Sequence, residues 1–190
     1  MSKQISIFFI LLLLPTLTFA HEAGGSGFMA GLTHPVLGLD HLLAMLSVGI
    51  LSAQMGGKAI WTVPLTFIVI MWVGGMMGIG SEAFDWVEKG IALPVIVLGL
   101  AIAFDKKQPL GLAMLGVGGF AFLHGHAHGV EMPNLASPGM YAIGFLLGTT
   151  VIHLAGVGIG VISEKMKDGV MLLRFGGAFI AGMGLQILIG

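Results

Sequence analysis

The sequence carries six apolar segments, each separated from the next by a short polar connection. A helix that crosses a bilayer needs about 20 residues, and these segments are close to that length. Charged residues make up only 9% of the chain, against about 25% in soluble domains, so lipid must surround much of it. The chain is therefore predicted to be an all-α, polytopic membrane helix bundle. The predicted spans are residues 28–53, 59–80, 87–104, 110–129, 139–162 and 170–189.

The first 20 residues have the layout of a secretory signal peptide. Lys3 precedes an apolar run, Pro15 ends the run, and small residues lead up to Ala20. This order favours a cleavable signal over an uncleaved anchor helix, and leaves residues 21–190 as the six-span membrane domain. Cleavage after Ala20 would make His21 the amino terminus. Its amine and imidazole would then offer two metal ligands, or would simply begin a flexible polar tail.

Cationic residues mark one side of the predicted bundle. The opposite side has only one cation, Lys89. By the positive-inside rule, the cation-rich side faces the cytoplasm. The mature amino terminus, and with six spans the carboxyl terminus, are then predicted to face the periplasm of a bacterial inner membrane. The cations on the cytoplasmic side are Lys58, Lys106, Lys107, Lys165, Lys167 and Arg174.

Composition also excludes several function classes. The chain has no cysteine, which rules out disulfides, thiol catalysis and thiolate metal sites. Its net charge is −1 and it has no basic cluster, so we expect no nucleic-acid partner. No glycine cluster lies between a strand and a helix, so no nucleotide-binding domain is expected. Glycines four residues apart instead indicate close helix packing in lipid; the pairs are Gly74/Gly78, Gly144/Gly148 and Gly156/Gly160.

The polar residues inside the predicted spans are few and gather in three segments. A charged group within a bilayer costs about 2.5–3.5 kcal/mol on insertion scales, so such groups are expected to be functional and to face the bundle interior. The first span contains His34, Asp40 and His41, and the fifth contains His153. The fourth span ends with His124, His126 and His128, and Glu131 follows.

Helical spacing sorts these residues into two groups. His34 and His41 are seven residues apart and would share one face of a continuous helix. His124 and His128, four apart, share a face of the fourth span, which Glu131 would extend. Imidazole and carboxylate ligands together suit nickel, cobalt, zinc or copper(II), and a carboxylate can also fix the tautomer of a ligating histidine. The pattern predicts a site for a divalent transition metal within the membrane.

Three further residues are secondary candidates for this site. His126 points roughly away from the face of His124. As a lone intramembrane histidine, His153 suits a hydrogen bond between helices as well as it suits metal binding. Met45, one turn beyond His41, is the methionine best placed to serve as a soft ligand, because most of the 13 methionines are expected to be flexible packing residues.

Two motifs resemble those of a known family. Residues 34–41 match His-Pro-x-x-Gly-x-Asp-His, and residues 124–131 match His-Gly-x-Ala-His-Gly-x-Glu. With a signal peptide and six spans, the chain resembles the HupE/UreJ family of nickel permeases over essentially its whole length. The resemblance does not support His126, which occupies a variable position of the second motif. It implies transport roles for His34, Asp40, His41, His124, His128 and Glu131.

The chain departs from the expected patterns at two points. Leu123 stands where a phenylalanine is expected before the histidine, which is a conservative change. The first motif is also similar to the His-x4-Asp-His signature of broader nickel and cobalt transporters. Here, however, five residues separate His34 from Asp40, so that similarity is looser.

The resemblance implies secondary transport of Ni²⁺ from periplasm to cytoplasm, with Co²⁺ as the alternative cargo. One alternative is a membrane sensor or accessory protein that binds metal for hydrogenase or urease maturation without translocating it. A third class, an intramembrane metalloenzyme, lacks support, because the sequence has neither a zincin helix motif nor a nucleophile signature. The chain is therefore not expected to be an enzyme.

Overall fold

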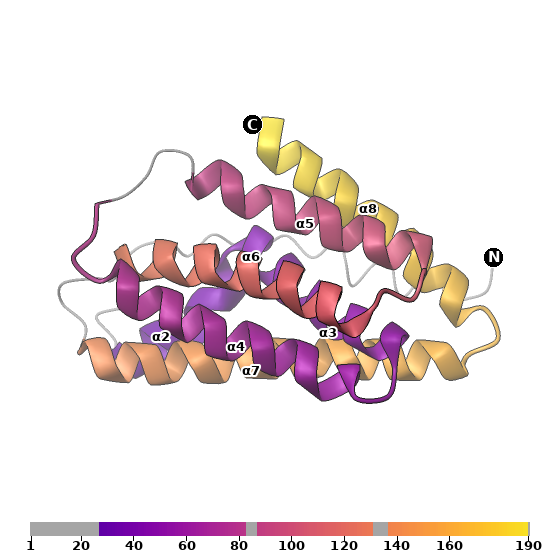
Figure 1. The fold of residues 1–190 in the computed structure, drawn as a ribbon, viewed down its shortest axis with the longest axis horizontal. Coiled ribbons are helices and arrows are strands. Elements are labelled where there is room, and N and C mark those ends of the chain that lie inside the picture. Colours follow the sequence, from indigo (N-terminus) through magenta and orange to yellow (C-terminus); the bar gives the residue numbers. More distant parts are fainter. Residues whose placement is uncertain (1–26, 83–86, 131–136, 190) are drawn as a thin grey trace.

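The chain folds into a bundle of α-helices, as expected from its composition (Figure 1). The computed structural model describes residues 27–82, 87–130 and 137–189, and only the backbone of residues 87–91. No strand occurs in these ranges. The predicted signal peptide, His21 and Glu131 lie outside the described residues. The helices are α2 (Gly27–Leu37), α3 (Leu39–Met55), α4 (Ala59–Gly78), α5 (Val87–Phe104), α6 (Leu110–Val130), α7 (Pro138–Lys165) and α8 (Gly169–Ile189).

Membrane-length helices dominate the described part of the chain. Four helices, α4, α6, α7 and α8, are long and apolar enough to cross a bilayer, and α2 with α3 makes a fifth if the pair counts as one span. The described apolar part of α5, Ala92–Phe104, falls short of that length. Large apolar side chains cover the outside: Leu115 is 75% exposed and Trp61 65% exposed. Such a surface requires lipid as its solvent, so this is a multi-pass membrane protein.

The first predicted span is not one continuous helix. It divides into α2 and α3, whose axes are bent by 79°. Pro35 lies inside α2, where its missing N–H removes one backbone hydrogen bond. Gly38 then adopts an extended conformation with φ −88° and ψ 117°, and its carbonyl oxygen accepts a hydrogen bond from the Leu42 amide at 2.9 Å. A new helix therefore begins at Leu39, which corrects the prediction of a straight first span.

Glycine contacts fasten the helices together in pairs. A Cβ atom on Gly125 of α6 would overlap the carbonyl oxygen of Met71 in α4, and one on Gly74 would overlap that of Phe122. The predicted close packing is confirmed, because every glycine of the three predicted pairs lies against the backbone of a neighbouring helix. Those pairs join α4 to α6, and α7 to both α2 and α3. Gly99 and Gly177 join α5 to α8 in the same way, a contact that was not predicted.

Helix α7 is the scaffold along which both halves of the broken span are aligned. It is 28 residues long and follows the long axis of the bundle (Figure 1). Gly144 in its first half packs against Phe28 and Leu32 of α2, whereas Gly156 in its second half packs against Leu46 of α3. The two short helices therefore occupy successive parts of one long helix, and the bend lies between them.

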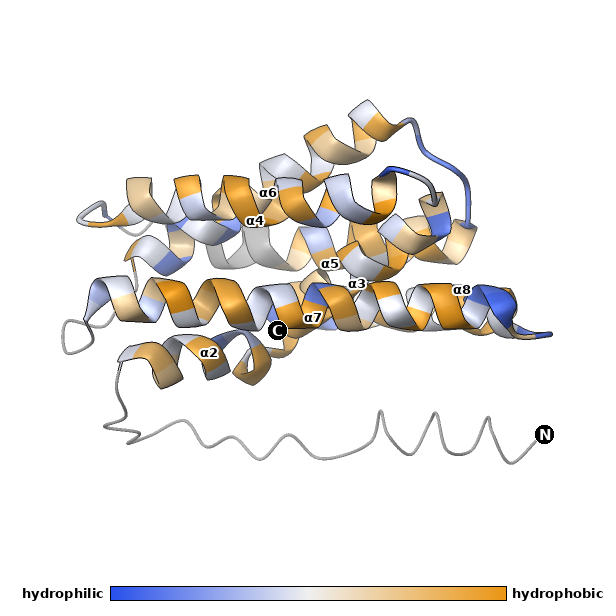
Figure 2. Ribbon diagram, turned by 90° about the horizontal axis from the view of Figure 1, so that it is seen from below, coloured by the Kyte–Doolittle hydropathy of each residue, from blue (hydrophilic) through white to orange (hydrophobic). Residues whose placement is uncertain are grey.

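One end of the bundle collects most of the described lysines. Helices α3, α5 and α7 end there. Two hydrogen bonds tie α5 to other helices at this end: Gln54 Nε2 of α3 donates to the Ile102 carbonyl at 3.3 Å, and Arg174 Nε of α8 donates to the Ala103 carbonyl at 2.9 Å. Strongly hydrophilic colours appear in connections at this end (Figure 2). We call it the lysine-rich end; its lysines are Lys58, Lys106, Lys107, Lys165 and Lys167.

Candidate metal centre

Four histidines from three helices meet in the half of the bundle away from the lysine-rich end. His34 of α2 lies against His128 of α6, with ring centroids 4.7 Å apart. His41 of α3 lies 4.4 Å from His124 and 4.6 Å from His128. The α6 pair is fully interior, because His124 is 4% exposed and His128 5% exposed. We call this group the four-histidine centre.

The bend between α2 and α3 brings His34 and His41 together. Along a straight helix, seven residues rise about 10.5 Å, which is too far for two imidazoles to hold one ion. Their ring centroids are 6.0 Å apart. The two histidines do belong to one group, but they are brought together by the break at Gly38 and not by the predicted shared helical face.

Asp40 fixes the orientation of the His41 imidazole. Its Oδ1 lies 2.7 Å from His41 Nδ1. A carboxylate oxygen accepts hydrogen bonds, so Nδ1 carries the proton and Nε2 presents a lone pair. Nε2 is buried and has no hydrogen-bond partner. A carboxylate behind a histidine is the usual support of a metal-binding imidazole. Asp40 therefore orients His41, and it is not among the residues whose possible ligand atoms cluster.

The two α6 histidines already stand at the separation of metal ligands. Their Nε2 atoms are 3.3 Å apart. Two nitrogens bound to one tetrahedral ion at about 2.0–2.1 Å are also separated by about 3.3 Å. Without metal, one Nε2–H donates to the other Nε2, so an ion that binds both must displace that proton. Where His128 is the donor, its own Nδ1, buried without a partner, is the atom that can receive the proton.

Nitrogen atoms from all three helices converge on a common volume. Ligand atoms of His34, His41 and His128 lie within 4.8 Å of one another. Imidazole nitrogens of this kind suit divalent nickel, cobalt, zinc and copper. Inward rotation of these rings over about 1–2 Å would bring them to coordination distance. The arrangement can therefore hold a dehydrated divalent ion in an otherwise apolar interior.

Comparison with known proteins agrees with the motifs and the centre. A profile of the HupE / UreJ protein family matches residues 9–187. The chain belongs to the HupE/UreJ family. It is similar to Protein HupE of Rhizobium leguminosarum bv. viciae, with 41% identity over 180 residues and 94% of each chain covered. No solved structure matches it. The resemblance inferred from the two motifs is confirmed.

An aromatic wall on α7 closes one side of the centre in this HupE/UreJ chain. The rings of Tyr141 and Phe145 stack 6.1 Å apart, and both lie within 6 Å of His34. Phe145 also lies 4.7 Å from His128. This wall was not predicted from the sequence, although the four-residue spacing of two aromatic residues on the fifth span was a usable signal.

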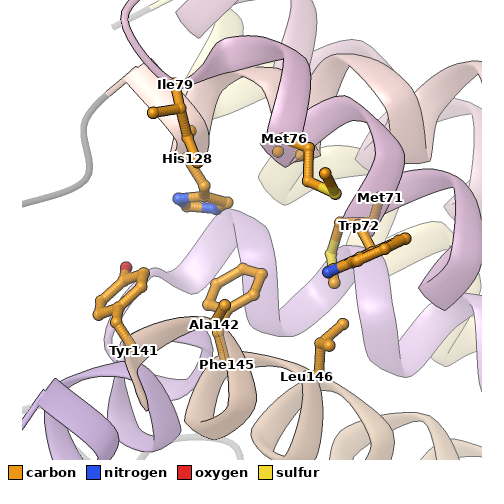
Figure 3. A pocket seen from close by; sticks show the side chains of 12 residues that line it. Met71, Trp72, Met76, Ile79, His128, Tyr141, Ala142, Phe145 and Leu146 are labelled. Carbon is orange, nitrogen blue, oxygen red and sulfur yellow. The ribbon is translucent and has the colours of Figure 1, made fainter. Parts of the chain in front are cut away.

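A small cavity adjoins the centre between α4, α6 and α7. Its volume is about 60 Å³, enough for one or two water molecules. His128 and Phe145 line it together with Trp72 and Met76 (Figure 3). Its lining is almost wholly apolar. The centre thus has free space beside it on the α4 side.

The secondary candidates fall outside the four-histidine centre. The His126 ring lies beside Phe122 of its own helix, 6.5 Å away. Met45 is fully buried in the apolar core, within the cluster that contains Phe67 and Met71. His153 lies on α7, with its ring 4.9 Å from that of Phe67. Of these three residues, His153 alone has an unpartnered buried nitrogen.

Gly38 provides a test of the Asp40–His41 pair within the HupE/UreJ centre. A Cβ atom at this position would lie 2.8 Å from His41 Nδ1 and 3.1 Å from Asp40 Oδ1, while the backbone conformation tolerates alanine. Gly38→Ala is expected to displace the pair and to weaken metal binding about tenfold or more, the effect of losing an orienting partner. Calorimetric titration with Ni²⁺ measures the affinity, and circular dichroism measures the helix content.

Gly158→Ala is the matched control, because a Cβ there meets nothing within 4 Å. It should bind Ni²⁺ as the wild-type chain does. Equal affinities for Gly38→Ala and wild type would contradict the orienting role of Asp40.

Proposed function

We propose that the chain is a secondary transporter that imports Ni²⁺, with Co²⁺ as the alternative cargo, from the periplasm to the cytoplasm. The observation that carries the proposal is the gathering of four histidines from α2, α3 and α6 inside an apolar bundle. Gathering four imidazoles in a membrane interior is costly, and a divalent ion would supply the partner that the buried Nε2 of His41 lacks. Membership of the HupE/UreJ family supports the same reading.

The proposed topology has six spans after a cleaved signal peptide of residues 1–20. The pair α2 and α3 forms a broken first span, and α5 is the third. The lysine-rich end faces the cytoplasm by the positive-inside rule, which places both termini in the periplasm and the chain in the inner membrane. The four-histidine centre then lies in the periplasmic half of the bilayer, where it would receive metal from outside.

Each polar residue has a defined part in the proposed path. Glu131, and His21 if the signal is removed, would capture the hydrated ion at the periplasmic mouth. The ligands of the centre would be His34, His41, His124 and His128, with Asp40 behind His41. Binding would displace the proton shared by the two α6 histidines. Imidazoles select against Mg²⁺ and Ca²⁺, which prefer oxygen ligands.

The membrane potential suffices to drive import. A divalent cation gains about 4.6 kcal/mol per 100 mV on moving to a negative interior, twice the value for one charge. That energy corresponds to a concentration ratio of about three decades. We therefore propose uniport, without ATP hydrolysis by this chain and without any catalytic activity.

Metal flux into proteoliposomes tests the function. Purified protein in vesicles with a negative-inside potassium diffusion potential should accumulate Ni²⁺ far beyond one ion per chain, and collapsing the potential should lower the plateau. Parallel uptake of Ni²⁺, Co²⁺, Zn²⁺ and Cu²⁺, each at limiting concentration, should rank Ni²⁺ first. A pH gradient of either sign, applied without a potential, should have little effect on a uniport.

The same experiment separates transport from its alternative. A sensor or accessory protein would bind metal and stop at a stoichiometric amount, whatever the potential. Saturation at one or two ions per chain would therefore sink the transport proposal and favour a role in hydrogenase or urease maturation. Faster uptake of Zn²⁺ or Cu²⁺ than of Ni²⁺ would overturn the proposed cargo but not the proposed transport function.

A further inference from the structure

A row of buried side chains on α7 continues from the four-histidine centre toward the lysine-rich end. Tyr141, Phe145, Thr149 and His153 follow each other at intervals of four residues, so they share one helix face, and all four are buried. The first two form the aromatic wall of the centre. His153 lies about 12 Å further along the helix axis than Phe145 and is only 1% exposed.

The hydrogen bonding of His153 leaves one nitrogen free to bind a ligand. Its Nδ1 lies 2.9 Å from the carbonyl oxygen of Thr149. A carbonyl oxygen only accepts, so Nδ1 carries the proton and Nε2 presents a lone pair. Nε2 is buried and has no partner. His153 therefore makes its hydrogen bond to its own helix, and the expected alternative of a bond between helices does not hold.

This state matches that of His41 in the centre. In both residues an acceptor holds the Nδ1 proton, and a buried Nε2 is left without a partner. Metal-binding histidines are commonly fixed in this tautomer by a carboxylate or a backbone carbonyl. His153 is thus prepared in the same way as the best-oriented histidine of the centre.

A second unpartnered polar group lies one turn away from His153. The hydroxyl of Thr149 is buried and makes no hydrogen bond. The adjacent Thr150 behaves in the ordinary way, since its hydroxyl donates to the Leu146 carbonyl at 2.7 Å. Thr149 therefore offers an oxygen atom on the same face of α7 as the free nitrogen of His153.

His153 lies close to the four-histidine centre, with the Phe67 ring beside both it and His124. The Phe67 ring centroid lies 5.9 Å from that of His124 and 4.9 Å from that of His153. The rings of His124 and His153 are consequently separated by no more than 10.8 Å, the sum of those two distances. Because α7 runs from the centre to Lys165, His153 is the deeper position.

We propose that His153 is a second metal-binding position, which the divalent ion occupies after it leaves the four-histidine centre for the lysine-rich end. The inference rests on the proposed transport function. The ligands at this second position are His153 Nε2 and the Thr149 hydroxyl, and water completes the coordination of the ion. Conduction requires sites from which an ion can also depart. A position with one imidazole binds more weakly than one with four, so it provides the step by which the ion is released inward.

Three substitutions of His153 test the proposal in proteoliposomes. His153→Leu should reduce the rate of Ni²⁺ uptake about tenfold or more, while equilibrium dialysis in detergent still finds tight binding at the centre. His153→Gln restores bulk and an amide that can bond the Thr149 carbonyl, but it lacks a good metal ligand, so uptake should stay low. His153→Cys should raise Cd²⁺ uptake relative to Ni²⁺, because a thiolate favours the softer ion.

Each outcome decides whether His153 binds the metal ion or only packs against neighbouring side chains. Uptake restored by His153→Gln, or an unchanged ratio of Cd²⁺ to Ni²⁺ uptake in His153→Cys, would overturn the inference. Wild-type uptake in His153→Leu would do the same, provided that His41→Ala is inactive in the same assay. Failure of the wild-type chain to accumulate metal would instead reject the transport function itself.

Discussion

Replacing His41 by alanine is expected to remove nearly all Ni²⁺ uptake. His41 contacts both α6 histidines and is the proposed ligand whose ring Asp40 orients. Loss of an orienting partner of a metal ligand commonly costs about 10- to 100-fold in affinity or activity, and loss of the ligand itself should cost more. Ni²⁺ uptake by His41→Ala and His124→Ala should therefore be lower than uptake by Asp40→Asn, which in turn should be lower than uptake by the wild-type chain. Uptake of radioactive nickel at limiting concentration measures the order.

His126→Ala is the matched control for these variants. It removes a histidine two residues from His124 and two from His128, on the same helix, but one that lies outside the centre. It should retain most of the uptake. The proposed centre is wrong if His41→Ala transports nickel as well as His126→Ala does at equal amounts of protein in the membrane.

Gly125→Ala is expected to have the second large effect, and to act through helix packing. Its Cβ atom would overlap the carbonyl oxygen of Met71 and lie 2.9 Å from the Gly75 amide nitrogen. These are backbone atoms of α4, so neither can rotate away, and the two helices must separate. Overpacking of this kind costs about 1–3 kcal/mol or more. The shift would also carry the adjacent His124 away from His41, so both thermal stability in detergent and uptake should decrease.

Gly119→Ala separates this effect from a general intolerance of α6 to alanine. A Cβ at Gly119 meets nothing within 4 Å, and alanine favours the helix. Its unfolding temperature should equal or exceed that of the wild-type chain. A Gly125→Ala chain as stable as Gly119→Ala would contradict the close α4–α6 contact.

Much of this architecture follows from local patterns that a single sequence contains. Apolar length predicts the helices, and glycines four apart predict that α4 and α7 pack closely against other helices, because both features depend on spacing along one helix. The grouping of His124 with His128 also follows from spacing alone. Burial cost in lipid then points to these residues as functional, whatever their detailed geometry.

Other features depend on contacts between distant segments and could not be predicted in the same way. Pro35 and Gly38 permit a break in the first span, but the 79° bend depends on where α7 holds the two pieces. The tautomer of His153 depends on whether its Nδ1 meets its own helix or a neighbour. Both features are decided by packing between helices, which cannot be read from the spacing of residues along one helix. The α5–α8 contact at Gly99 and Gly177 likewise required knowledge of which helices are neighbours.

The glycine contacts divide the centre between two groups of helices. Glycines of α7 pack against α2 and α3, and this group carries His34, His41 and His153, whereas α4 and α6 form a second group that carries His124 and His128. The four-histidine centre thus lies at the boundary of these groups, and we expect them to move relative to each other, as in transporters that rock one bundle against another. Such a displacement would change the His41–His124 and His41–His128 separations and leave the Asp40–His41 pair intact. Opening and closing of the proposed site would therefore need no unfolding of any helix.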